Sequence, residues 1–176
     1  MRPQPGGTRR SGSTLVIGLG NPLMGDDGVG LELLAYLQSH WTFQPEVIFV
    51  DGGTWGMNLL PVIEDAGRVL FLDAVKTGKP AGTAVRLEHG QLPRWLGFKL
   101  SPHQIDLKEV LALAELRGTL PREAVVVGIQ PQQVEMELGL SAVVADSIPA
   151  AAELALLTLE RWGHRAVRES GVAVYA

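Results

Sequence analysis

Acidic side chains follow three apolar runs of the sequence, and an imidazole comes from a fourth segment. Asp26 and Asp27 come shortly after "TLVIGLG", Asp51 ends "EVIFVD", Asp73 ends "VLFLD", and His103 lies in "SPHQ". Carboxylates combined with an imidazole suit zinc, nickel or non-haem iron better than magnesium. Two carboxylates and one imidazole from separate loops therefore indicate a divalent-metal site with open positions. Their spacing is not that of a local metal motif such as H-E-x-x-H.

The first loop, "GLGNPLMGDDGVG", begins like a phosphate-binding turn. Gly18 and Gly20 fit the dinucleotide pattern G-x-G-x-x-G, but Leu23 stands where the third glycine belongs. Acidic side chains at the start of the next helix suit the helix dipole and would repel a phosphate. We expect Asp26 to cap that helix, which leaves Asp27 available for another role.

The other candidate side chains have structural alternatives. Asp73 ends a strand, so its carboxylate either accepts hydrogen bonds from loop backbone or binds a ligand. Asp51 opens "DGGT", a turn that the aspartate itself can stabilise. His103 projects from the first turn of a helix that Ser101 caps and in which Gln104 completes a capping box. We expect the remaining histidines to be solvated surface residues: His40, His89 and His164.

The elements that must position these residues alternate between strands and helices. Apolar runs predict buried strands over 14–20, 46–53, 68–75 and 124–131, with an edge or antiparallel strand over 82–88. Helical patterns cover 29–38, 56–66, 101–118 and 141–163, with Pro61 and Pro149 limiting or kinking the second and the last of these. This order predicts an α/β three-layer sandwich, with a twisted, mainly parallel sheet and helices on both faces. In such sheets ligands bind outside the carboxyl ends of the strands, where the candidate acids lie.

Length and composition limit the alternatives. The chain has 176 residues, and we expect a disordered tail over 1–12, one domain over 13–165 and a C-terminal tail over 166–176. The net charge of −4 lacks the basic balance of a nucleic-acid binder. Cysteine is absent, which excludes thiolate nucleophiles and suits a reducing cytoplasm. We expect no apolar stretch to approach the roughly 18 residues that span a membrane.

At these segments the chain resembles the maturation endopeptidases of nickel-iron hydrogenases, most closely those of membrane-bound uptake hydrogenases. The resemblance runs from about Thr14 to about Gly163. It is carried, in order, by "GLGNPLMGDDGVG", "DGGTWGMNLL", "LDAV", "SPHQIDLKEVLALAELRG" and "VVGIQP". It implies a cytoplasmic α/β enzyme that removes a C-terminal peptide from the hydrogenase large-subunit precursor after nickel insertion.

The resemblance also implies roles for particular residues. The family's metal-contacting positions fall on Asp27, Asp73 and His103, and the two aspartates are the catalytic candidates. The nickel is then carried by the substrate rather than held permanently by the enzyme. Either the metal polarises the scissile carbonyl for an activated water, or an aspartate acts as base and the nickel serves only recognition. "DGGTWG" looks like the family's substrate-facing loop, which implicates Asp51, Gly52, Gly53 and Thr54.

Two other functions use some of the same features. A nickel-binding chaperone would use the same three ligands without cleaving a bond. Peptidyl-tRNA hydrolases also open with a strand and G-L-G-N-P-G, but Leu23 replaces the last glycine here, and their T-R-H-N segment is missing. An acidic chain also suits tRNA poorly. The acids of the first loop argue against a dinucleotide-binding module.

Overall fold

The computed structural model describes residues 12–88 and 107–169, apart from the side chain of Lys108. In this part of the chain, five strands form one sheet in the order β3-β1-β4-β6-β5. The first four are parallel, and β5 is antiparallel to β6 at the edge. The predicted fold class is confirmed. The strands are β1 (Thr14–Leu19), β3 (Ile48–Gly53), β4 (Arg68–Ala74), β5 (Ala84–Glu88) and β6 (Glu123–Ile129).

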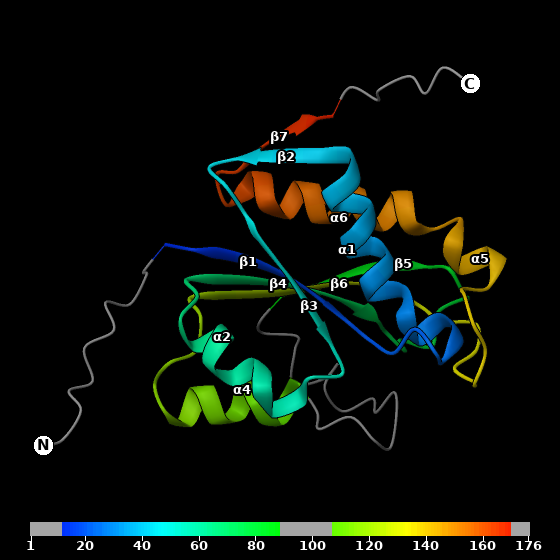
Figure 1. The fold of residues 1–176 in the computed structure, drawn as a ribbon, viewed down its shortest axis with the longest axis horizontal. Helices are drawn as coiled ribbons and strands as arrows, with labels where there is room; N and C mark the ends of the chain where they lie inside the picture. Colours follow the sequence, from blue (N-terminus) through cyan, green and yellow to red (C-terminus); the bar gives the residue numbers. More distant parts are fainter. Residues whose placement is uncertain (1–11, 89–106, 170–176) are drawn as a thin grey trace, which may run out of the picture.

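Helices cover both faces of this sheet (Figure 1). Strand β4 shows why, because its side chains alternate between two apolar clusters. Leu70 and Leu72 pack in the cluster under α1 and α6, whereas Val69 and Phe71 pack in the cluster over α2 and α4. Burial on both faces explains the continuous apolar run of this strand. The helices are α1 (Val29–His40), α5 (Ala142–Ala145) and α6 (Ile148–Arg161) on one face, and η2 (Gly56–Leu59), α2 (Leu60–Glu64) and α4 (Leu107–Leu116) on the other.

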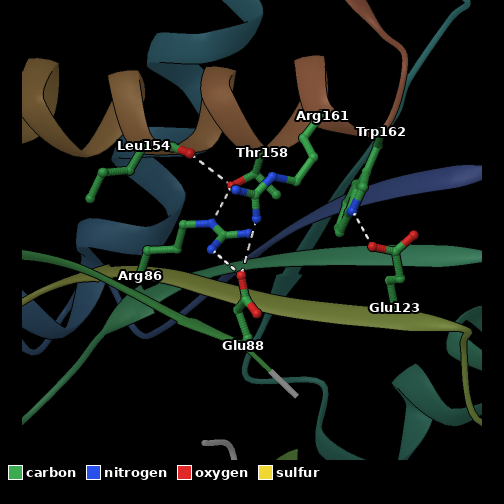
Figure 2. A network of polar contacts seen from close by, with 7 residues as sticks. All are labelled: Arg86, Glu88, Glu123, Leu154, Thr158, Arg161 and Trp162. Carbon is green, nitrogen blue, oxygen red and sulfur yellow. Dashed lines mark hydrogen bonds and ion pairs between the residues drawn. The ribbon is translucent and has the colours of Figure 1, made fainter. Parts of the chain in front are cut away.

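Polar contacts fix α6 and its end against β5 and β6 (Figure 2). The Nε of Arg86 donates to Oγ1 of Thr158 at 2.8 Å, and the same guanidinium pairs with Glu88. Past the end of α6, Nε1 of Trp162 donates to Oε2 of Glu123 at 2.8 Å. Glu123 is the first residue of β6, and Glu88 pairs with Val125, so the two carboxylates of this network lie toward the amino end of β6.

The segment Ala142–Arg161 contradicts the expectation that no apolar stretch approaches the length needed to span a membrane. It is long and apolar enough, by length and composition, to pass for a membrane-spanning helix. Its chain is divided into α5 and α6, with Pro149 in the first turn of α6, where proline is tolerated. Ala151, Ala155 and Leu159 on α6 are fully buried in the core. Core packing therefore accounts for only part of the apolar composition, since 33% of the most apolar window is buried and Leu157 is 60% exposed.

A second, two-stranded sheet was not predicted. Strand β2 (Trp41–Gln44) pairs antiparallel with β7 (Arg165–Arg168), beside α1 and α6 (Figure 1). Strand β7 ends inside the segment 166–176 that the sequence assigned to a C-terminal tail.

The prediction that His164 is a solvated surface residue is wrong. Its side chain is buried next to β7. Its Nδ1 lies 2.7 Å from the Pro45 carbonyl oxygen, and its Nε2 lies 2.8 Å from Oγ1 of Thr14. The imidazole thus joins the start of β1 to the segment between β2 and β3.

Candidate active site

The loops at the carboxyl ends of the parallel strands lie next to one another. Gly18 of β1 pairs with Asp51 of β3 on one side and with Leu72 of β4 on the other. Just beyond β1, the Gly20 amide donates to the Gly53 carbonyl at 3.0 Å. The first loop and the "DGGT" loop are therefore joined, as the rule for parallel sheets predicts.

Asp27 lies in the short 3-10 helix η1 (Gly25–Gly28), which packs against β4. Its side chain is only 1% exposed. Oδ2 accepts a hydrogen bond from the Asn21 amide at 2.9 Å, whereas Oδ1 has no hydrogen-bond partner among the described residues. Burial raises the pKa of Asp27, and the Asn21 amide and the Lys76 ammonium oppose this shift only in part. A buried oxygen without a partner is costly, so it marks a place where a cation or a proton can bind.

Gly20 is required for this geometry. Its φ is +119°, and a Cβ there would lie 1.8 Å from the backbone carbonyl oxygen of Asp27. Only glycine allows the chain leaving β1 to approach η1 so closely. Gly20 of the "GLGN" segment thus allows two parts of the protein, the loop after β1 and η1, to approach each other closely.

The prediction that Asp26 caps the following helix is wrong. Its buried carboxylate makes no cap hydrogen bond and instead reaches the loop after β6. Oδ2 accepts from the amides of Gln132 and Gln133 at 2.8 and 3.1 Å and from Oγ of Ser141 at 2.9 Å. Oδ1 accepts from the Ser141 amide at 2.7 Å. Burial raises the pKa of Asp26, but these four hydrogen bonds outweigh it and hold the pKa below its usual value.

Asp73 lies near the end of β4 and is also buried, with 6% of its surface exposed. Its Oδ1 accepts a hydrogen bond from the Ala74 amide at 2.8 Å. By the alternation of β4, Asp73 belongs to the same face as Val69 and Phe71, which is the face covered by α2 and α4. Of the two roles considered for Asp73, the hydrogen bond from neighbouring backbone is present. The carboxylate also lies near the carboxyl end of β4, where ligands bind in parallel sheets.

The turn predicted at "DGGT" lies one residue later, at 52–55, because Asp51, Gly52 and Gly53 belong to β3, and among the described residues the Asp51 side chain makes no hydrogen bond that would stabilise it. The Trp55 amide donates to the Gly52 carbonyl at 2.8 Å, and Gly53 has a φ of +38°. Asp51 and Thr54 are exposed, while Gly52 is buried under the end of β1. The loop therefore presents two polar side chains to solvent next to the first loop.

The third predicted ligand, His103, lies outside the described residues. Within residues 12–88 and 107–169, no group of three His, Cys, Asp or Glu side chains is arranged to hold a metal. Helix α4 begins at Leu107, four positions after His103, and packs on the sheet face to which Asp73 belongs. The three-ligand set stays a prediction.

The sequence did not reveal two contributors to this region. Lys76 influences Asp27 electrostatically, and its place three residues after Asp73 could have drawn attention to it. The contact between Asp26 and the loop after β6 could not be predicted, because its donors are the backbone amides of Gln132 and Ser141, more than a hundred positions away.

Known proteins provide an independent comparison. A sequence model of the family described as "Hydrogenase maturation protease" matches residues 31–158. The hydrogenase expression/formation protein HoxM of Cupriavidus necator is 38% identical over 155 residues, covering 85% of this chain and 75% of that protein. The hydrogenase 2 maturation protease of Escherichia coli is 31% identical over 159 residues, covering 90% and 97%.

A solved structure agrees with these matches. The hydrogenase-maturating endopeptidase HybD from Escherichia coli superimposes with a TM-score of 0.83 at 30% identity, covering 89% of this chain and 98% of that one. The chain belongs to the hydrogenase maturation protease family, as its sequence motifs implied.

Proposed function

We propose that this protease removes the C-terminal extension of a nickel-iron hydrogenase large-subunit precursor after nickel insertion, and that Asp27, Asp73 and His103 contact the nickel carried by that substrate. The observation that carries the proposal is the buried Oδ1 of Asp27, which has no hydrogen-bond partner among the described residues. A carboxylate oxygen in that state suits a cation that arrives with the substrate.

The surroundings of Asp27 support this assignment over Asp26. The Asp26 carboxylate accepts four hydrogen bonds, all of them from one loop, so that side chain has a structural task. Asp27 uses one oxygen for the Asn21 amide, which fixes the carboxylate and leaves the other oxygen available. Asp73 supplies the second acid from β4, the strand that pairs with β1.

Peptide hydrolysis then needs a water to add to the scissile carbonyl and a proton to reach the leaving amine. The chain contains no cysteine, so a thiolate cannot be the nucleophile. Two mechanisms fit this arrangement. In one, Asp27 accepts a proton from the attacking water and the nickel serves only recognition, and the raised pKa of Asp27 in the metal-free protein suits a base. In the other, Asp27 and Asp73 would hold the substrate's nickel, and the metal would polarise the scissile carbonyl for the water. A cytoplasmic location, where precursors are assembled, is part of this proposal.

The test is the intact mass of the large-subunit precursor, nickel-loaded and nickel-free, after incubation with the protein. We expect a single C-terminal peptide to be lost from the loaded form only. Asp27→Asn, Asp73→Asn and His103→Ala should abolish the loss. Asp65→Asn is the matched control, because Asp65 is an exposed aspartate that precedes β4 at the opposite edge of the sheet.

The same experiment separates a protease from a nickel-binding chaperone. A chaperone would leave the mass of the loaded precursor unchanged while still taking up nickel. Cleavage of the nickel-free precursor at the same rate would contradict the role given to Asp27, Asp73 and His103 but leave the protease activity in place.

A further inference from the structure

Exposed apolar side chains gather in the loops around Asp27. Leu23, in the loop after β1, is 58% exposed, and Met136 and Leu138, in the loop after β6, are 89% and 80% exposed. Both loops follow the carboxyl ends of parallel strands, β1 and β6, so the two loops lie at the same end of the sheet as the candidate acids. We call Leu23, Met136 and Leu138 the apolar ledge. Apolar side chains exposed together on a soluble protein mark an interaction site more often than scattered ones do.

The backbone of the ledge is fixed. Met24 and Glu137 form an isolated parallel bridge between the two loops. The Glu137 amide donates to the Leu23 carbonyl at 3.2 Å, and the Gly25 amide donates to the Glu137 carbonyl at 2.8 Å. In this register Leu23 and Met136 occupy facing positions, one residue before the bridged pair. The apolar side chains are therefore presented by a defined structure and not by a free loop.

Asp26 holds the same loop at both of its ends. Its carboxylate binds the amides of Gln132 and Gln133 on one side and the amide and hydroxyl of Ser141 on the other. The buried anion thus closes the loop 132–141 against η1. Because Asp27 is the next residue, the position of the ledge is coupled to the position of the candidate catalytic carboxylate.

Acidic residues alternate with the apolar ones along this loop. Glu135 and Glu137 are exposed and flank Met136, and Leu138 follows them. Nε2 of Gln133 donates to Glu137, which holds that carboxylate on the loop. A loop that exposes both acidic and apolar side chains complements a segment that carries basic and apolar ones.

We propose that the apolar ledge is the docking site for a segment of the large-subunit precursor that carries apolar and basic side chains next to the cleaved bond. The inference rests on the proposed function, because a substrate whose bond reaches Asp27 must lie across the loops that surround it. Met136 and Leu138 provide the buried contact on binding, Leu23 extends it toward the first loop, and Glu135 and Glu137 attract the basic residues.

Direct binding and cleavage test the proposal together. The Kd of the full chain for the nickel-loaded precursor and the kinetics of cleavage are measured for the wild type and for the double variant Met136→Ser/Leu138→Ser. Because a few well-buried apolar contacts dominate most interfaces, we expect Kd and KM to rise about tenfold or more, with kcat within about twofold of wild type. The side chains are exposed in the free protein, so the variant should fold as the wild type does.

Leu116→Ser is the matched control. Leu116 is 85% exposed, on α4 and far from the ledge in sequence, and its replacement should leave both constants unchanged. The wild-type Kd should also weaken as salt is raised, because the acidic residues contribute by attraction of opposite charge. A salt-independent Kd would overturn that part of the proposal.

The outcomes separate this inference from the function itself. If the wild type cleaves the loaded precursor and the double variant does so with unchanged KM and Kd, the ledge is not the docking site while the proposed function stands. If the wild type neither binds nor cleaves the precursor, both proposals fail. If the double variant dissociates a dimer in sedimentation and leaves Kd unchanged, the ledge joins two copies of this chain and the docking proposal is overturned.

Discussion

The two adjacent aspartates should respond oppositely to neutralisation, although they differ by one position. Asp26→Asn replaces one acceptor oxygen by a donor. If the remaining oxygen keeps the Gln132 and Gln133 amides, the new amide group faces the Ser141 N–H, so that hydrogen bond is lost. A hydrogen bond to a charged group contributes about 1.5–3 kcal/mol, and the others weaken with the charge, so we expect a loss of about 3 kcal/mol. For a chain of this length that lowers Tm by roughly 6–12 °C.

Asp27→Asn should behave differently. Its carbonyl oxygen can still accept from the Asn21 amide, and the new amide group replaces the oxygen that lacks a partner. Burial raises the pKa of Asp27, so the ionised carboxylate destabilises the folded state at neutral pH, and neutralising it removes that cost. We expect the free energy of unfolding of the variant to equal or exceed that of the wild type, while cleavage is lost.

The way in which the free energy of unfolding changes with pH provides a second test of the two aspartates. The raised pKa of Asp27 means that the folded state binds the proton more tightly. Stability is therefore lost as pH rises from the usual aspartate value near 3.8 toward the folded pKa, and Asp27→Asn should not show this loss. The pKa of Asp26 is lowered, so its contribution is present above 3.8 and is lost as pH falls toward the folded pKa.

The assay is urea unfolding followed by circular dichroism, on the metal-free protein, at several pH values. Comparable destabilisation by the two substitutions would refute the division of tasks, because it would mean that both carboxylates are structural. An Asp26→Asn variant as stable as the wild type would show that the loop after β6 does not depend on that anion.

Three further results are expected. Gly20→Ala should destabilise the fold by about 3 kcal/mol or more, measured by urea unfolding, because its Cβ would overlap the Asp27 carbonyl at an unfavourable φ. His164→Ala should cost about 2–4 kcal/mol in the same measurement and leave kcat unchanged, because it deprives buried Thr14 of its partner and the Pro45 carbonyl of its contact. Nickel added to the free protein should raise the Tm of the wild type more than that of Asp27→Asn, and equal shifts would contradict a metal contact at Asp27.

Much of the fold could be predicted because its signals are local. The strands at 14–20, 68–75 and 124–131 are continuous apolar runs, since a parallel strand covered on both faces has no polar side. The run at 46–53 was also expected to be a buried strand, and this prediction is wrong, because β3 is an edge strand in which only Gly52 is buried. The sequence at 82–88 alternates, and β5 lies at the edge of the sheet, where Val85 is its one buried residue.

What the sequence did not reveal depends on partners far away in the chain. Strands β2 and β7 are four residues each, and neither has a pattern without the other, which lies more than a hundred positions away. The burial of His164 has the same cause, since it follows from contacts with Thr14 and Pro45. Pro61 was expected to limit or kink a helix, and it instead lies in the first turn of α2, after the 3-10 turn η2.

The pair of aspartates illustrates why the candidate site was only half predictable. In a 3-10 helix with about three residues per turn, consecutive side chains point about 120° apart, so Asp26 and Asp27 face different parts of the protein. One carboxylate is directed at the loop after β6 and the other toward Asn21. A sequence reader sees two equivalent acids, and only the backbone conformation of η1 distinguishes them. The same geometry makes them interdependent: moving η1 to free one carboxylate would misplace the other, so Asp26, which anchors the loop after β6, and Asp27, the candidate catalytic group, keep a fixed relation.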